Sequence, residues 1–273
     1  MLTVTSSCGQ GRVTVKASEN YITQDIATPQ TFTAIDLKGS MDVEYRESGD
    51  GTTKVYAYGS DNVLPYLDVT VNNGTLRVST KKGVNIIGKS RLTVYASSPE
   101  LRRAAITGSG DIEIKSHLTT EEDLEFRVTG SGDIDQESGL KCRGFTAVVT
   151  GSGDISIDGV VCEDATLNVT GSGDIDIDVL VCDRVNAEVI GSGDIEIGGT
   201  ADMLSAVVSG SGDISASGLT AKAVDAKISG SGDISCHPQE SLTSRVSGSG
   251  TVWYVGAPAK IDSQGRKGSL RRR

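Results

Sequence analysis

The sequence predicts an all-β protein that folds as a parallel β-helix, a solenoid with coils of about 20 residues. Three observations predict it: a pentapeptide that recurs at nearly constant spacing, apolar residues that alternate on both sides of it, and no helical periodicity between copies. The pentapeptide Gly-Ser-Gly-Asp-Ile begins at Gly108, Gly130, Gly151, Gly171, Gly191, Gly210 and Gly230, and a variant, Gly-Ser-Gly-Thr-Val, begins at Gly248. The intervals are 22, 21, 20, 20, 19, 20 and 18 residues, which marks a stack of small units that cannot bury their apolar faces alone.

Each repeat contains two predicted strands. The residues two, four and six positions before a motif are apolar, as in Leu124, Phe126 and Val128. The residues four and six positions after the first Gly are also apolar, as in Ile175 and Ile177. This alternation is typical of a strand with one buried face, so equivalent strands of successive coils are expected to pair. A third apolar corner is predicted eleven residues before the next motif, at Leu140, Val160, Leu180 and Leu219.

The Gly-Ser-Gly segment is interpreted as a corner that every coil turns in the same place. Glycine permits positive φ and a close approach of neighbouring backbones. A phosphate-binding loop would require a helix after the glycines, whereas a strand follows here.

An acidic face is predicted next to this corner. The Asp of each motif points outward if the Ile after it points inward, which gives the column Asp111, Asp133, Asp154, Asp174, Asp194, Asp213 and Asp233. Two residues further on, the same face adds Glu113, Asp135, Asp176 and Glu196. Like charges at the spacing of adjacent strands repel and should raise some carboxylate pKa values. Two explanations remain open: the carboxylates accept hydrogen bonds from corner N–H groups, which we favour, or Ca²⁺ lies between the coils.

Four regions are expected along the chain. Residues 1–19 form a lead-in, 20–104 form irregular coils that cap and begin the helix, 105–255 form the regular coils, and 256–273 form a basic disordered tail. A separate small β domain is the alternative for the second region. A degenerate form of the corner motif is already present at Gly39, and a weaker one at Gly59. Trp253 and Tyr254 are expected to cap the C-terminal end of the solenoid. Six basic residues against Asp262 give the tail a net charge of +5 and leave −15 on the rest, which argues against nucleic acid as a partner.

Cys8 is the candidate lipid-attachment residue. It follows small residues in Thr5-Ser6-Ser7-Cys8-Gly9, as at a bacterial lipoprotein processing site, although a basic segment and a long apolar stretch are missing before it. We interpret residues before Cys8 as the remnant of a signal peptide. A lone cysteine in a flexible N-terminus is an equal alternative.

Enzyme constellations are not evident in the sequence. His117 and His237 lack metal-ligand spacing, and no serine can be paired with a neighbouring base. Cys142, Cys162 and Cys182 each lie nine residues before a motif and are expected to stack as small inward side chains. We therefore predict no catalytic residues and no metal site.

The segment from Phe32 to Tyr45, the later Gly-Ser-Gly-Asp-Ile series and the Cys8-Gly9 pair resemble the putative auto-transporter adhesin, head GIN domain family, over roughly residues 30–255. This family occurs in cell-envelope proteins, many of them lipoproteins, of Bacteroidetes-type bacteria. The resemblance implies a right-handed parallel β-helix and an adhesin-like role, and it supplies no catalytic residues.

The predicted function is that of a non-enzymatic cell-envelope protein with an adhesin-like, scaffolding or binding role. Its partners are expected to be a protein or glycan ligand and, through an N-terminal anchor, outer-membrane lipid, with the protein facing the periplasm or the cell surface. No cofactor is predicted apart from the Ca²⁺ alternative. The competing function is that of a glycan-active β-helix enzyme, a polysaccharide lyase or a glycosidase; equal coil lengths, which leave no long loops to form a cleft, argue against it.

Overall fold

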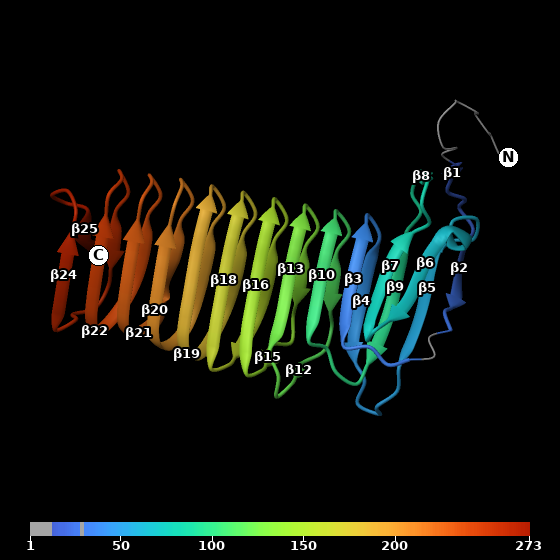
Figure 1. Ribbon diagram of the computed structural model, residues 1–273, viewed down its shortest axis with the longest axis horizontal. Coiled ribbons are helices and arrows are strands. Elements are labelled where there is room, and N and C mark those ends of the chain that lie inside the picture. Colours follow the sequence, from blue (N-terminus) through green and yellow to red (C-terminus); the bar gives the residue numbers. More distant parts are fainter. Residues whose placement is uncertain (1–12, 28–29) are drawn as a thin grey trace.

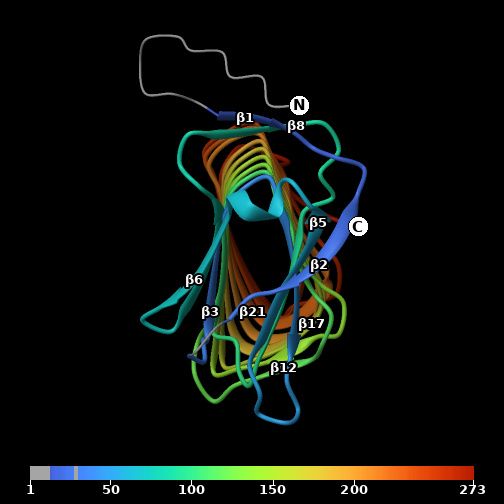
Figure 2. The same ribbon diagram turned by 90° about the vertical axis from the view of Figure 1, so that its right-hand side faces the viewer.

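A computed structural model describes residues 13–27 and 30–273 and confirms the parallel β-helix. Figure 1 shows the strands side by side in one long row, and Figure 2 looks along that row, with successive coils one behind another. All but two of the strands belong to one hydrogen-bonded set of 23 strands, and β1 and β8 form a separate parallel pair. The molecule is one elongated solenoid.

The strands fall into three groups along the chain. The first group is β1 (Val13–Lys16), β2 (Tyr21–Asp25), β3 (Ala34–Gly39), β4 (Asp42–Glu47), β5 (Lys54–Ser60), β6 (Leu67–Asn72), β7 (Thr75–Thr80), β8 (Val84–Ile87) and β9 (Thr93–Ser98), with one 3₁₀ turn, η1 (Leu64–Tyr66). The second group is β10 (Arg103–Gly108), β11 (Ile112–Ile114), β12 (Leu118–Thr119), β13 (Leu124–Gly130), β14 (Ile134–Gln136), β15 (Leu140–Lys141), β16 (Gly144–Gly151), β17 (Ile155–Val161), β18 (Asp164–Gly171), β19 (Ile175–Gly191), β20 (Ile195–Val208), β21 (Ile214–Ile228), β22 (Ile234–Val246) and β23 (Val252–Tyr254). The last is β24 (Lys260–Gln264) and β25 (Leu270–Arg272).

The core consists of columns of like side chains, as the sequence predicts. Ile175 pairs in parallel register with Ile155 on one side and with Ile195 on the other, and all three are buried. On the strand before the corner, Val189 lies between Val169 and Val208, which are also buried. Full burial of an aliphatic side chain stabilises the fold by about 1.5–3 kcal/mol, so the columns are the main source of stability.

One inward position holds a polar residue. Gln136 occupies the place of Ile157 in the next coil and is 1% exposed. Its amide nitrogen donates to the carbonyls of Ser116 (2.9 Å) and Gly139 (2.8 Å), and its oxygen accepts from the N–H of Ser138 (2.7 Å). The side chain therefore satisfies backbone groups at a corner where the ladder is interrupted.

The degenerate repeat at Gly39 forms a coil, but the order of the coils in space differs from their order in the sequence at this point. Strand β3 pairs with β10, so that Gly39 lies beside Gly108, and β4 pairs with β11, so that Val43 lies beside Ile112. The opposite edges of β3 and β4 pair with β7 and β9. The coil of residues 34–47 is thus inserted between two coils that follow it in sequence, as Figure 1 shows.

The weaker motif at Gly59 is not a corner, and that prediction is wrong. Gly59 lies within β5, which runs antiparallel to both β2 and β9. The antiparallel pair β6–β7 completes this end of the solenoid. An antiparallel strand cannot continue a parallel coil. The N-terminal end therefore combines parallel strands that follow the coil with antiparallel strands that extend the same sheet.

The end of the chain also differs from the predicted disordered tail. Strand β24 pairs in parallel with β22, and β25 pairs in parallel with β23, so the chain completes one more coil. The guanidinium groups of Arg271 and Arg273 lie 5.3 and 5.4 Å from the Trp253 ring centroid. The segment is ordered because its backbone pairs with an otherwise open sheet edge, while its basic side chains are exposed. Trp253 is accordingly covered by a further coil rather than terminal.

Candidate functional site

The glycine corners form two columns in which neighbouring backbones approach closely. Gly151 has φ +133°, a conformation that L side chains rarely adopt. Gly153 has no such restriction, but a Cβ there would collide with the carbonyl oxygen of Gly132 in the preceding coil. The backbone conformation explains the first Gly, and the close approach of the neighbouring coil explains the second. A strand follows each corner, as at Ile155.

The motif aspartates form a ladder of hydrogen bonds between coils. The carboxylate Oδ1 of each accepts from the backbone N–H of the equivalent residue one coil further on, as between Asp133 and Asp154 at 2.8 Å. The other members of the ladder are the carboxylates of Asp42, Asp111, Asp154, Asp174, Asp194, Asp213 and Asp233, with N···O distances of 2.6–3.2 Å. The hydrogen-bonded alternative for this column is the arrangement that the structure contains.

The ladder exists because the peptide direction changes at this residue. The N–H of Asp154 points to the preceding coil, and so does its carbonyl, which accepts from Ile134 at 3.0 Å. The carbonyl of Asp133 likewise points backward and accepts from Ile112 (2.9 Å), so it cannot face the N–H of Asp154. A side-chain acceptor is needed at this one position, and Asp is short enough to supply it.

Both ends of the ladder follow the same logic. The N–H of Asp42 donates to the carbonyl of Leu92 at 3.1 Å, so no carboxylate is needed below it. At the far end Thr251 replaces Asp, and the N–H of Ser269 in the next coil donates to the carbonyl of Arg266 instead. Thr251 therefore does not need a carboxylate, because the equivalent N–H of the next coil, that of Ser269, already has a backbone acceptor.

An outward row of side chains runs along the strands that follow the corners, in one register from end to end. In spatial order the row is Asp25, Tyr56, Tyr95, Glu44, Glu113, Asp135, Ser156, Asp176, Glu196, Ser215, Ser235, Trp253 and Arg271. Its middle part contains Glu113, Asp135, Asp176 and Glu196, the second set of carboxylates of the predicted acidic face, together with serines. Every member except Ser235, which is buried, is at least partly exposed, and the row has tyrosines near one end and a tryptophan near the other.

The acidic part of the row borders a hollow of about 380 Å³ lined by Ser156, Ile157, Asp158, Asp176, Asp178 and Glu196. Partial burial, followed by repulsion from Glu196 and Asp174, raises the pKa of Asp176 above its usual value. Partial burial and the neighbouring Asp133 and Glu113 raise the pKa of Asp135 in the same way. Within residues 13–27 and 30–273, no group of three or more His, Cys, Asp or Glu residues is arranged to hold a metal ion.

Comparisons with known proteins agree with this architecture. The family described as "Putative auto-transporter adhesin, head GIN domain" matches residues 31–163 and 147–258. The chain belongs to this family. No curated protein matches it.

Several crystal structures share the fold of this head GIN domain chain. One is described as a putative adhesin from Parabacteroides distasonis, with 21% identity, a TM-score of 0.75, and coverage of 95% of this chain and 100% of that one. A second, a putative adhesin from Parabacteroides merdae, has 22% identity, a TM-score of 0.69, and coverage of 95% and 99%. A third is described as a putative lipid binding protein from Parabacteroides distasonis, with 24% identity, a TM-score of 0.69, and the same coverage.

The cysteine column of this head GIN domain chain holds free thiols. Cys142 and Cys182 are buried and Cys162 is partly buried, in agreement with the inward direction predicted for them. Burial raises the pKa of the Cys142 thiol to about 12, and burial raises that of Cys236 to about 12 as well. Such thiols are poor nucleophiles at neutral pH, which agrees with a structural role.

The remaining predicted residues are dispersed. The Nδ1 atom of His117 lies 2.9 Å from the carbonyl of Ser138, and the His237 ring lies where a Cβ added at Gly256 would meet it. Cys8 lies outside the described residues. No helix in the described ranges 13–27 and 30–273 is long and apolar enough to cross a membrane.

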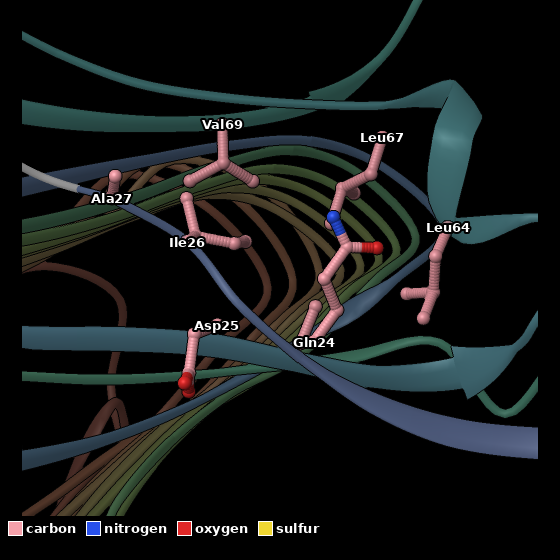
Figure 3. Close-up of a pocket in the computed structure, with 8 residues that line it drawn as sticks. Gln24, Asp25, Ile26, Ala27, Leu64, Leu67 and Val69 are labelled. Atoms are coloured by element: carbon pink, nitrogen blue, oxygen red, sulfur yellow. The ribbon is translucent and has the colours of Figure 1, made fainter.

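A hollow of about 230 Å³ lies at the N-terminal end of the head GIN domain solenoid (Figure 3). Figure 3 shows Ile26 and Val69 pointing toward one another, with Leu64 and Leu67 on the opposite side. These side chains come from η1, β6 and the segment after β2. The hollow is an opening of the core at the end of the coils.

Two features of the site were not predicted from the sequence. One is the tyrosine cluster of β2, β5 and β9, and the other is a cavity of about 130 Å³ lined by Glu44, Arg46, Lys54, Tyr56, Tyr95, Ala96 and Ser97. The alternation of β5 places Tyr56 and Tyr58 outward, which was a usable signal. The pairing of β5 with β9, which brings Tyr95 beside Tyr56, could not be read from the repeat because β5 is reversed.

Proposed function

We propose that this chain is a non-enzymatic binding protein of the bacterial cell envelope with an adhesin-like role. The observation that carries the proposal is the outward row, a line of side chains in register along the coils from β2 to β25, in which every member except the buried Ser235 is at least partly exposed. Extended repeat surfaces of this kind suit the binding of large partners. Membership of a family described as an adhesin head domain supports the same role.

The chemistry of the repeat also supports a binding role. The carboxylates of the motif aspartates, such as Asp154, accept hydrogen bonds from backbone N–H groups of the next coil. A carboxylate that serves the backbone in every coil is not poised as an acid or base at one point of the rod. Its recurrence supports a structural role for the motif, with binding assigned to the side chains around it.

Beads coated with the full chain test this proposal. We expect them to adhere to host-cell layers or to a matrix of mucin and extracellular proteins more strongly than beads coated with an unrelated β-solenoid of equal charge. Deletion of the gene in the producing bacterium should lower adherence to the same surfaces. Equal adherence in both comparisons would contradict an adhesin-like role.

We further propose that the protein is attached to outer-membrane lipid through Cys8, with the rod in the periplasm or on the cell surface. The small residues before Cys8 motivate this proposal. Metabolic labelling with a fatty-acid analogue in cells that express the gene should label the protein, and Cys8→Ser should abolish the label. Unchanged labelling of the variant would exclude this anchor.

A glycan-active enzyme is the second candidate, and one observation favours it. The cavity beside Tyr56 combines Arg46 and Lys54 with the carboxylate of Glu44. Glu44 is the one carboxylate among the residues that line this cavity, and its Oε1 is paired with Arg46 at 3.0 Å. Hydrolysis of a glycosidic bond ordinarily uses two carboxyl groups, so the cavity favours binding over hydrolysis. Release of new reducing ends or unsaturated products from an acidic polysaccharide by the purified chain would favour the enzyme.

A further inference from the structure

Four of the seven tyrosines of the chain gather on the outer surface of β2, β5 and β9. The rings of Tyr56 and Tyr95 are stacked with centroids 4.8 Å apart and planes 8° apart. The rings of Tyr21 and Tyr58 lie 6.0 Å apart at 25°, and the guanidinium of Arg91 lies 5.2 Å from the Tyr21 centroid. Core packing does not account for these rings, because the strands bury the alternate side chains instead.

The exposed fractions of neighbouring side chains on β5 show which of them form the core. On β5 the side chains of Val55 and Ala57 are 4% and 1% exposed, whereas Tyr56 is 38% exposed. Aromatics make up only 4% of the chain, so their gathering on one outer face of one end is a specific feature of the sequence. Exposed aromatic clusters of this kind are common at sites that bind ligands or partners.

Basic side chains lie in the adjacent row. Lys54 pairs across the strands with Ser97, and Ser97 with Arg46, directly beside the row that holds Tyr56 and Tyr95. Arg46 is held by Glu44, with its Nε and Nη2 atoms 3.1 and 3.0 Å from Oε1. Lys54 is exposed. These groups and the two rings line the cavity of about 130 Å³.

The combination matches the chemistry of an acidic sugar. The C–H face of a pyranose ring packs on aromatic rings through dispersion, and its carboxylate or sulfate accepts charge-assisted hydrogen bonds from Lys and Arg. One carboxylate and two cations give the lining of the cavity a net positive charge, although Asp25 and Glu113 flank it in the row. A neutral sugar would leave that charge without a partner.

We propose that the cavity formed by Tyr56, Tyr95, Lys54 and Arg46 binds a saccharide that carries a carboxylate or a sulfate. This inference rests on the proposed binding function and specifies the ligand class. The tyrosine rings contact the sugar ring, Lys54 and Arg46 bind the anionic group, and Glu44 holds Arg46 in position.

An array of saccharides that contain uronic acids, sialic acid or sulfated sugars, together with their neutral counterparts, tests the inference on the full chain. We expect binding to acidic members and weaker binding to the neutral ones. Calorimetry with the best ligand should show that Tyr56→Ala and Lys54→Gln each weaken binding by about tenfold or more, the size of one aromatic or charge-assisted contact. Tyr56→Phe, which keeps the ring, should retain most of the affinity.

Matched controls separate a local effect from misfolding. Lys222 does not line this cavity; its Nζ atom forms an ion pair with Asp202 Oδ1 at 2.6 Å. Lys222→Gln should therefore leave saccharide binding unchanged. Thermal unfolding of each variant near the wild-type temperature shows that the fold is intact, and the exposure of Tyr56 makes that the expected result.

The outcomes distinguish this inference from the proposed function. A protein that adheres to surfaces but binds no acidic saccharide, or whose Tyr56→Ala and Lys54→Gln variants bind as the wild type does, overturns the inference and leaves the adhesin-like role. A preference for neutral sugars also overturns it. Turnover of a bound acidic saccharide supports the site and overturns the non-enzymatic function.

Discussion

The Oδ1 atom of Asp154 accepts a hydrogen bond from the backbone N–H of Asp174, one coil away, at 2.8 Å. This contact couples the side chain of one repeat to the backbone of the next and explains why Asp recurs at the corner. It also implies that the charge of the carboxylate is secondary to its acceptor oxygen.

Substitution of Asp154 tests that conclusion. Asp154→Ala leaves the N–H of Asp174 without an acceptor and should lower the free energy of unfolding by about 1–3 kcal/mol. Asp154→Asn keeps a side-chain oxygen and removes repulsion from Asp133 and Asp174, so it should be neutral or slightly stabilising. Chemical denaturation measures both, with Asp158→Ala, an exposed acidic residue outside the ladder, as the control. Equal destabilisation by Ala and Asn would mean that the charge, and not the acceptor, is what matters.

The glycine of the corner should be intolerant of any side chain. In Gly153→Ala the added Cβ collides with the carbonyl of Gly132, so neighbouring coils must move apart. Overpacking of this kind should lower stability by about 1–3 kcal/mol. Ser152→Ala, at the exposed residue between the two glycines, is the control and should change the melting temperature little. A stable Gly153→Ala variant would show that the coils have more room than the structure indicates.

The direction of side chains on β19 gives a third prediction. Ile175 is fully buried between Ile155 and Ile195, so Ile175→Asp places an unpaired charge in the core and should cost several kcal/mol. Asp176 points outward beside Glu196, and Asp176→Asn should leave the melting temperature equal to or slightly above that of the wild type at pH 7. Comparable losses in thermal unfolding would contradict this assignment of the two faces.

The regular coils could be predicted because each residue there repeats one local environment. Ile175, Gly153 and Asp154 have the same role in every coil, so the sequence shows the environment several times. The N-terminal end could not be predicted in the same way. The insertion of β3 beside β10, and the reversal of β5, depend on long-range pairing that no repeat reveals.

The candidate site lies in that less predictable part. Tyr56 and Tyr95 are 39 residues apart in sequence and meet only because β5 and β9 pair antiparallel. The tail was mispredicted for a related reason. Its basic composition is typical of a disordered end, yet an open sheet edge at β22 and β23 pairs with it.

Calcium should have little effect on stability. The ladder carboxylates already accept backbone hydrogen bonds, as Asp194 does from Asp213 at 2.7 Å, so binding of Ca²⁺ there would compete with the fold. We expect the same melting temperature in millimolar Ca²⁺ and in chelator. A large rise with Ca²⁺ that is lost in Asp176→Asn would instead assign a cation site to the acidic part of the outward row.

The acidic part of the row should also make stability depend on pH in an unusual direction. The pKa values of Asp135 and Asp176 are raised in the folded chain, by burial first and by neighbouring carboxylates second. A carboxyl group whose pKa is higher in the folded than in the unfolded state binds protons more strongly when folded. Its contribution to stability is therefore greatest below the unfolded pKa of about 4 and is lost as pH rises through the folded value.

Other carboxylates act in the opposite direction, so the prediction needs a difference measurement. Arg143 lowers the pKa of Asp123, and Arg102 lowers that of Glu100, so these groups lose their stabilising effect as pH falls through their folded pKa values. A double variant, Asp135→Asn with Asp176→Asn, removes two groups with raised pKa values and leaves Asp123 and Glu100 unchanged. It should melt above the wild type at pH 7, and the gap should shrink as pH falls toward about 4, where the wild-type carboxyls become protonated. A gap that stays constant over this range would show that the pKa values of these two carboxyl groups are not raised in the folded chain.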